Sequence, residues 1–343
     1  MKRTYFLFIF LLAVLFGTAV YALTPEEILL LKRSGVSDEK ILEMQKKEAS
    51  PPQPAPKINP FDWNEDGKKD IIAGSDRGRV YVYLNTGTNL QPIFDKATEI
   101  YGAEIMRFSK PSVVDWNNDG KKDILVGAKS GELSIFINRG SNQQPIFGDE
   151  IKLNDGVLDV GSFSSPAMVD WNSDGKRDLV VGNQSGKIFL FLNIGNDGAP
   201  SFSSKGADTY INVSSYATPF IIDWNNDGKF DVICGSGDGK VYIFINEGDN
   251  KNPTFGKAQT LQVNNKELKL PGPTSVIAVD WDDDGKTDLL VSNKAIVEEG
   301  PTPDRKDIIP LGIYLLLNTG TKDKPEFKEL KQIKGKFRDD TAL

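Results

Sequence analysis

The sequence Asp62-Trp63-Asn64-Glu65-Asp66-Gly67-Lys68-Lys69-Asp70 recurs four more times along this chain of 343 residues. The further copies are DWNNDGKKD from Asp115, DWNSDGKRD from Asp170, DWNNDGKFD from Asp223 and DWDDDGKTD from Asp280. Successive copies begin 53, 55, 53 and 57 residues apart, and together they contain all five tryptophans. A fixed period of this length is the signature of a repeat architecture.

The similarity between the copies extends well beyond the acidic phrase. Three apolar residues follow each copy, and a glycine comes after them in the first four, at Gly74, Gly127, Gly182 and Gly235, whereas the fifth has Ser292. An apolar run then leads to Asn-x-Gly, which begins at Asn85, Asn138, Asn193, Asn246 and Asn318. Pro-x-Phe follows at a constant distance and ends at Phe94, Phe147, Phe202, Phe255 and Phe327.

Each unit has four short apolar stretches in about 50 residues, which is the size of one four-stranded propeller blade. The strands are expected before the acidic phrase, in the triplet, in the run before Asn-x-Gly and around Pro-x-Phe. A blade cannot bury both faces alone, so five copies predict an all-β, five-bladed β-propeller over residues 57–337. A flat linear array is the alternative topology, although it would leave two terminal faces in water.

Positions 1, 3, 5 and 9 of each phrase carry oxygen donors, which predicts a cation site in every copy. Glycine at position 6 permits the positive φ of a tight turn, and the backbone carbonyl of position 7 can face the same ion. Oxygen ligands without nitrogen or sulfur favour Ca²⁺, up to five ions in all. The predicted ligands are Asp62, Asn64, Asp66, Lys68, Asp70; Asp115, Asn117, Asp119, Lys121, Asp123; Asp170, Asn172, Asp174, Lys176, Asp178; Asp223, Asn225, Asp227, Lys229, Asp231; and Asp280, Asp282, Asp284, Lys286, Asp288, each lysine through its carbonyl.

The acidic phrase could also be an EF-hand loop or a solvated acidic turn. An EF-hand needs Glu at position 12 on a following helix, but position 12 is apolar here: Ala73, Val126, Val181, Cys234 and Val291. The pattern is therefore not an EF-hand. A solvated acidic turn would not require the fixed spacing of the donors.

The chain resembles the FG-GAP/VCBS-type repeats of calcium-binding β-propellers, such as those of integrin α-subunits. The resemblance covers about 280 residues and rests on the five acidic phrases, the glycines after the first four triplets, Phe147-Gly148 and Phe255-Gly256. It implies that the acidic loop joins the first two strands of a blade and holds Ca²⁺. Because integrin propellers have seven blades, the family does not set the blade number.

Composition excludes several classes of function. The chain has no histidine, so Ser-His-Asp and Cys-His catalysis and His-ligated zinc or haem are excluded. With 41 Lys and Arg against 48 Asp and Glu, the net charge of −7 argues against a nucleic-acid partner. The single cysteine, Cys234, aligns with the apolar triplets and is expected to be buried. Without an internal disulfide, calcium is expected to hold the fold together.

The N-terminal region predicts export. Lys2 and Arg3 precede an apolar run that ends in Val20-Tyr21-Ala22, the pattern of a signal peptide over residues 1–22. An uncleaved membrane anchor is the alternative. A helical hairpin is expected over 23–50, a Pro-rich linker over 51–56 and a tail over 338–343. The protein is thus expected to be secreted, periplasmic or at the cell surface, without a membrane span after cleavage.

The face opposite the acidic loops is predicted to bind a ligand, since its connections vary between copies. Its aromatic residues could stack on a sugar or anchor a peptide, or only cover the blade ends: Tyr101, Phe108, Phe163, Tyr210 and Tyr216. The fifth copy also has an insertion within 293–311.

The sequence therefore predicts a binding module for a surface glycan, an envelope component or a protein, and no catalytic residues. One alternative is a carboxylate-dependent glycoside hydrolase or lyase that uses the central channel. The other is a structural protein that self-associates through residues 23–50.

Overall fold

The computed structural model contains two compact units, Met1–Gln53 and Pro54–Leu343. The described residues are 32, 37, 59–105, 107–117, 119–148, 150–153, 158, 160–195, 200–202, 207–293 and 312–337. Apart from Lys32 and Ser37, the predicted signal peptide, hairpin, linker and C-terminal tail lie outside these residues. Within the described part of the chain, no helix has the length and apolarity needed to cross a bilayer.

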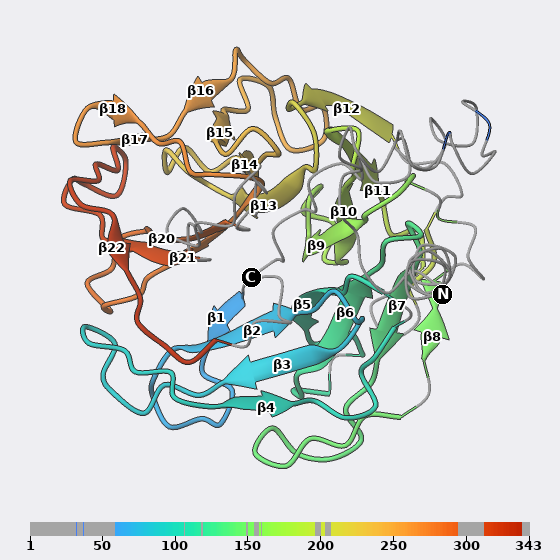
Figure 1. Ribbon diagram of the computed structural model, residues 1–343. Helices are drawn as coiled ribbons and strands as arrows, with labels where there is room; N and C mark the ends of the chain where they lie inside the picture. Colours follow the sequence, from blue (N-terminus) through green and yellow to red (C-terminus); the bar gives the residue numbers. More distant parts are fainter. Residues whose placement is uncertain are drawn as a thin grey trace. The chain divides into compact units, whose positions relative to one another are not determined.

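Five antiparallel four-stranded sheets form a ring, which confirms the five-bladed propeller (Figure 1). Blade 1 comprises β1 (Asn59–Phe61), β2 (Asp70–Gly74), β3 (Val80–Tyr83) and β4 (Ala97–Glu99). Blade 2 comprises β5 (Lys110–Val114), β6 (Asp123–Gly127), β7 (Leu133–Phe136) and β8 (Ile151–Lys152). Blade 3 comprises β9 (Ser165–Val169), β10 (Asp178–Gly182), β11 (Lys187–Phe191) and β12 (Ala207–Asn212).

Blade 4 comprises β13 (Thr218–Ile222), β14 (Asp231–Gly235), β15 (Val241–Phe244) and β16 (Gln259–Thr260). Blade 5 comprises β19 (Thr274–Val279), β20 (Asp288–Asn293), β21 (Gly312–Leu316) and β22 (Lys331–Gln332). Each blade is a contiguous stretch of chain whose strands follow in order from the centre of the ring to its rim (Figure 1). A separate hairpin, β17 (Gln262–Val263) and β18 (Lys266–Glu267), lies between blades 4 and 5 and was not predicted.

The fourth strand of each blade begins later than the sequence suggested. It was expected around Pro-x-Phe, but that segment belongs to a tight loop folded around the preceding Asn-x-Gly. In blade 2, Asn138 Oδ1 accepts the N–H groups of Gly140 (2.9 Å) and Ile146 (3.1 Å), and Phe147 makes a single bridge back to Asn138. The asparagine side chain therefore satisfies backbone groups that a longer strand would have paired.

The tryptophans pack between blades, as expected of packing residues. In four of the five copies the indole of the acidic phrase contacts the Pro-x-Phe ring of the next blade. The ring centroids are 6.4 Å apart for Trp63–Phe147 and Trp116–Phe202, and 6.2 Å apart for Trp171–Phe255 and Trp224–Phe327. Each contact ties two blades together through apolar surface removed from water.

The strands that contain the apolar triplets lie in the core. All residues of β2, β6, β10 and β14 are buried. Cys234 is among them, and burial raises the pKa of its thiol to about 12, which confirms it as a buried apolar residue.

Blades 5 and 1 close the ring, which excludes the linear array. Trp281 of blade 5 lies in one apolar cluster with blade-1 residues, and its Nε1 donates to the carbonyl of Asn89 at 2.5 Å. Asp283 forms an ion pair of 2.9 Å with Lys69. Beyond β22, the N–H of Lys336 donates to the Phe94 carbonyl at 2.8 Å. No sheet among the described residues mixes strands from the two ends of the propeller.

The glycines after the triplets mark where adjacent blades approach most closely, and this can be tested. A Cβ at Gly127 would overlap the backbone carbonyl of Ser164 and lie 2.8 Å from Pro166 Cδ. We expect Gly127→Ala to lower the free energy of unfolding by about 1–3 kcal/mol, the usual cost of overpacking. The measurement is urea unfolding, with Gly148→Ala as control because its Cβ would meet only the Arg139 side chain, at 3.4 Å. Equal stability of the two variants would contradict this close approach.

Candidate metal centres

The first half of each acidic phrase curls around the carboxylate at position 1. In blade 1 the N–H groups of Asp66 and Gly67 donate to the two carboxylate oxygens of Asp62, at 2.9 and 2.8 Å. The N–H of Lys68 donates to Asp66 Oδ1 at 3.0 Å. Gly67 has φ of 84°, as a tight turn of this kind requires. The same three hydrogen bonds recur in the other four loops.

The aspartate at position 9 is buried and connects the loop to the sheet. In blade 1, Asp70 accepts the N–H of Trp63 (2.7 Å) and the N–H of Asn85 (2.8 Å), one on each carboxylate oxygen. Burial raises the pKa of Asp70 to about 6 and that of Asp288 to about 6, although these N–H donors act in the opposite direction. The sequence had assigned this residue only to the cation.

The fifth loop brings its carboxylates closest together. Asp280, Asp282 and Asp288 each offer an oxygen within 4.8 Å of the others, and they are the one such acidic triad among the described residues. Asp282 Oδ1 is buried without a hydrogen-bond partner. Like charges at this separation repel, and a buried oxygen without a donor is costly, so a hard cation fits the donor set.

The aspartate at position 5 accepts hydrogen bonds within its own loop, and its role as a cation ligand stays a prediction. In the fifth loop, Asp284 stays outside the triad and accepts both the N–H (2.9 Å) and the Nζ (2.8 Å) of Lys286. The lysine side chain at position 7 also lies beside position 5 in other loops, at 3.5 Å for Lys121–Asp119. The sequence predicted a role only for the backbone carbonyl of these lysines. That carbonyl's role as a ligand stays a prediction.

The other four loops have asparagine at position 3. In blade 1 this side chain turns its nitrogen to position 5, with Asn64 Nδ2 donating to Asp66 Oδ2 at 3.2 Å. At positions 1, 3, 5 and 9 these loops therefore carry one carboxylate fewer than the fifth. We infer a weaker attraction for a divalent cation in each of them.

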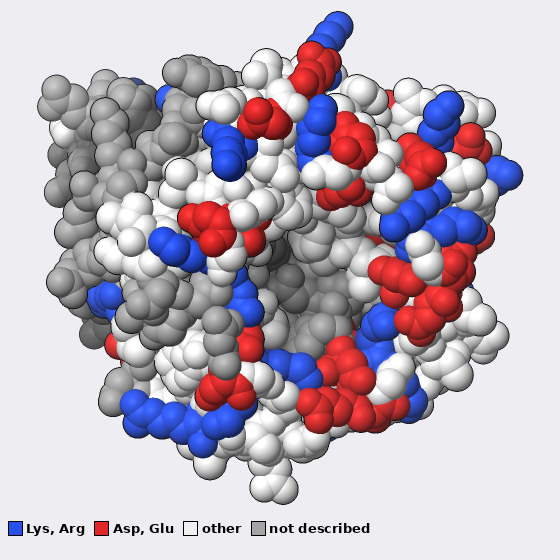
Figure 2. All heavy atoms as spheres, turned by 180° about the vertical axis from the view of Figure 1, so that it is seen from behind, with Lys and Arg blue, Asp and Glu red and all other residues white. Residues whose placement is uncertain are grey.

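The loops also contact the neighbouring blade. Lys122 of blade 2 donates from Nζ to the carbonyl of Asp62 at 2.6 Å, beside the blade-1 loop. Figure 2, which shows the ring from behind, displays groups of acidic side chains around the central hollow with basic side chains next to them. A cation bound in a loop would thus act close to a blade interface.

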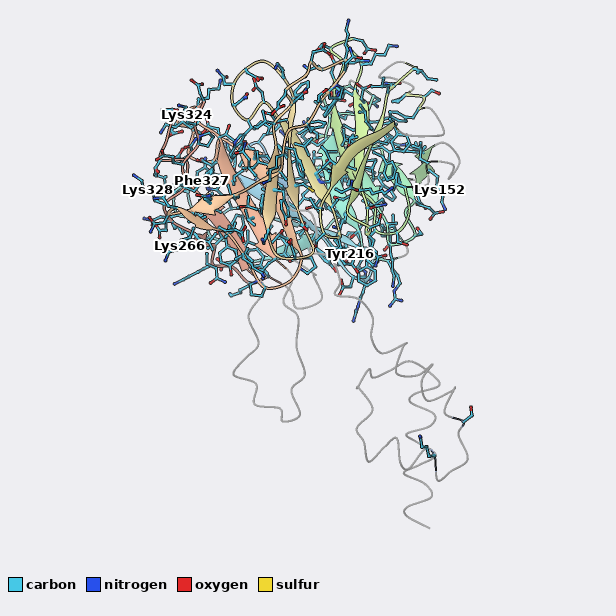
Figure 3. The ribbon with its side chains drawn as sticks, turned by 90° about the horizontal axis from the view of Figure 1, so that it is seen from above. Lys152, Tyr216, Lys266, Lys324, Phe327 and Lys328 are labelled. Atoms are coloured by element: carbon cyan, nitrogen blue, oxygen red, sulfur yellow. The ribbon has the colours of Figure 1, made fainter. Side chains whose placement is uncertain are left out.

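Three of the five aromatic residues predicted to bind a ligand pack against one another in a row. Phe108 and Phe163 lie 5.5 Å apart, Phe163 and Tyr216 5.4 Å apart, and Lys129 Nζ lies over the first two rings at 5.1 and 5.6 Å. Phe163 is 4% exposed and Tyr216 is 3% exposed. All three aromatic residues have positive φ, a conformation that was not predicted from the sequence. The row covers the blade ends on the face where Figure 3 labels Tyr216.

The remaining two aromatic candidates differ from this row. Tyr101 is 79% exposed and is the aromatic side chain of the set that solvent reaches most freely among those described. The side chain of Tyr210 lies outside the described part of the structure. Ligand binding by these residues stays a prediction.

Comparison with known proteins identifies the repeat. Residues 62–126, 115–176, 170–232 and 223–291 match the FG-GAP-like repeat model. The chain belongs to the FG-GAP-like repeat family. This confirms the resemblance inferred from the sequence.

Several relatives share part of the FG-GAP-like region. Cartilage acidic protein 1 of Xenopus tropicalis is 28% identical over 187 residues, which is 51% of this chain and 27% of that protein. Human integrin alpha-6 is 30% identical over 149 residues, 38% of this chain and 12% of that protein. The chain thus spans about a quarter or less of these relatives. An Agrocybe aegerita lectin that recognises non-reducing terminal N-acetylglucosamine aligns with a TM-score of 0.41 at 16% identity, covering 84% of this chain and 82% of its own.

The structural role of position 9 can be separated from cation binding. Asp123→Asn would place an amide NH₂ against the N–H of Trp116 or Asn138, which donate to Asp123 at 2.9 and 2.7 Å. One buried N–H then loses its acceptor, so we expect a loss of about 1–3 kcal/mol in chelator-treated protein. Urea unfolding measures it, and Asp119→Asn, at an exposed side chain, is the control. Equal stability of the two variants would show that the buried hydrogen bonds to Asp123 do not stabilise the fold.

Proposed function

We propose that this chain is an exported, calcium-stabilised FG-GAP-like propeller that acts as an interaction module. Its target would be a surface glycan, an envelope component or another protein. The observation that carries the calcium part is the Asp280–Asp282–Asp288 triad with the unpartnered Asp282 Oδ1. All its ligands are oxygens, which suits Ca²⁺ better than a transition metal.

Calcium would act mainly on stability. The chain has one cysteine, and Cys234 is buried, so an internal disulfide cannot strengthen the fold. Each acidic loop begins beside a blade interface, and its position-9 aspartate reaches the core. A cation that neutralises the loop would therefore favour the closed ring over the unfolded chain.

The hydrogen bonds that the aspartates already accept within the protein favour a binding role over an enzymatic one. Glycosidase chemistry needs two carboxyl groups free to face a substrate. The regularly placed aspartates instead accept backbone N–H groups or lysine side chains within their own blades. The leader-like residues 1–22 support the export part of the proposal.

Calcium removal should destabilise the protein. A ligand at a concentration 100 times its Kd adds about 2.7 kcal/mol per site, so chelation should lower the thermal midpoint by several degrees. Titration with calcium should show one tighter site, which Asp282→Asn weakens. In the converse variant, Asn225→Asp, the blade-4 loop gains the fourth carboxylate and should bind more tightly. An unchanged midpoint in chelator would exclude a structural role for calcium.

The binding role is tested by a screen against glycans and surface proteins, run with calcium and with chelator. We expect at least one target whose binding falls when the propeller loses calcium and loosens. Measuring the thermal midpoint of the same samples controls for simple unfolding. If the protein is folded with calcium and binds neither a glycan nor a surface protein, the interaction-module proposal is contradicted.

A further inference from the structure

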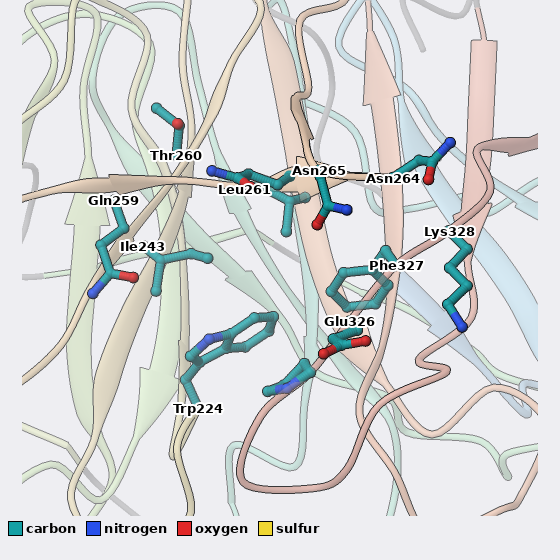
Figure 4. A pocket seen from close by; sticks show the side chains of 12 residues that line it. Trp224, Ile243, Gln259, Thr260, Leu261, Asn264, Asn265, Glu326, Phe327 and Lys328 are labelled. Carbon is teal, nitrogen blue, oxygen red and sulfur yellow. The ribbon is translucent and has the colours of Figure 1, made fainter.

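A pocket of about 560 Å³ lies between blades 4 and 5 (Figure 4). The extra hairpin β17–β18 forms one side of it and is held to blade 5, since the N–H of Asn264 donates to the Phe327 carbonyl at 2.7 Å. Asn264 and Asn265 form the turn of this hairpin, with φ of 50° and 60°. The volume is within the range of ~300–1,000 Å³ usual for small-molecule sites.

An aromatic pair forms the floor of the pocket. Trp224, from the acidic phrase of blade 4, packs against Phe327 of blade 5 with ring centroids 6.2 Å apart and an interplanar angle of 29°. Trp224 Nε1 makes no hydrogen bond to any described residue, whereas the equivalent Nε1 of Trp281 donates to a carbonyl. Trp224 is 9% exposed, so the pocket reaches a small part of the indole surface together with this free donor.

The walls are polar and carry unused hydrogen-bonding groups. The side chains of Gln259, Gln262, Asn265, Glu326 and Lys328 line the pocket and, within the described chain, make no hydrogen bond or ion pair. Figure 4 shows Gln259, Asn265 and Glu326 around the same space as the Trp224 ring. Each amide supplies two donors and an acceptor.

This combination matches the chemistry of a sugar ring. A pyranose has an apolar C–H face for the indole and hydroxyl groups that both donate and accept hydrogen bonds. One carboxylate and one ammonium balance each other, so the lining does not select a strongly charged ligand.

Another blade interface shows what the hairpin changes. Trp63 and Phe147 form the same aromatic pair between blades 1 and 2. There Glu65 accepts hydrogen bonds from Asn142 (2.8 Å) and Gln143, so polar groups of the two blades satisfy one another. Between blades 4 and 5, the polar side chains that line the pocket make no such hydrogen bond among the described residues.

We propose that the pocket beneath β17–β18 binds a neutral saccharide through Trp224, Gln259, Asn265 and Glu326. This inference rests on the proposed binding function and names its ligand class. The apolar C–H groups of the sugar contact the accessible part of Trp224, and the two amides and the carboxylate hold its hydroxyls.

The experiment titrates the full chain, loaded with calcium, with the methyl glycosides of glucose, galactose, mannose and N-acetylglucosamine by calorimetry. A peptide library is tested in parallel. We expect at least one glycoside to bind, and Gln259→Ala combined with Asn265→Gly to weaken it about tenfold, since each lost hydrogen bond is worth ~0.5–1.5 kcal/mol. Glycine suits the positive φ of Asn265.

Trp224→Phe should weaken binding while keeping the packing with Phe327. The matched control is Trp63→Phe, the same change at the interface of blades 1 and 2, which should leave binding unchanged. Sugar binding that survives in the pocket variants, or falls equally in Trp63→Phe, would overturn the site. So would binding of peptides, but of no glycoside, that depends on Trp224.

The two proposals can fail separately. If the wider screen finds a target that binds the pocket variants as well as the original protein, the pocket assignment is wrong and the interaction module stands. If the folded protein binds nothing in either screen, both proposals are wrong.

Discussion

The structure depends on a buried carboxylate that accepts two backbone N–H groups, repeated once in every blade. Asp70 and its equivalents join the end of the acidic loop to the end of the third strand, through the N–H groups of a tryptophan and an asparagine. These donors offset the cost of removing the charge from water. The acidic phrase and Asn-x-Gly are therefore two halves of one hydrogen-bonded unit, which explains why they recur together.

The same unit couples the loop to its neighbour. The tryptophan whose N–H contacts the buried aspartate places its indole on the phenylalanine of the next blade. A change at the loop, such as a bound cation, is thus one residue away from an interface between blades. Local charge and the packing of the ring are linked through this tryptophan, so the loops matter to the whole ring although they lie at its surface.

Repetition made most of the fold predictable, and departures from repetition were missed. The five phrases were sufficient for the blade number. The fourth strand was misplaced because the side chain of Asn138 folds the Pro-x-Phe segment into a loop, which apolar patterning does not reveal. The β17–β18 hairpin occurs once, so no comparison between copies could identify it. The convergence of Asp280, Asp282 and Asp288 was expected, whereas the turn of Asp284 toward Lys286 depends on rotamers.

The closure between blades 5 and 1 has a mechanical consequence. The chain enters the ring at β1, and its last described residues run beside Phe94. There the N–H of Lys336 donates to the Phe94 carbonyl, and the rings of Phe337 and Tyr83 have centroids 5.1 Å apart. Among the described strands, none from one end is built into the sheet of the other. A tensile load applied through both ends would therefore peel off this last short segment first, one contact at a time. The seam would open before any of the five sheets had to shear.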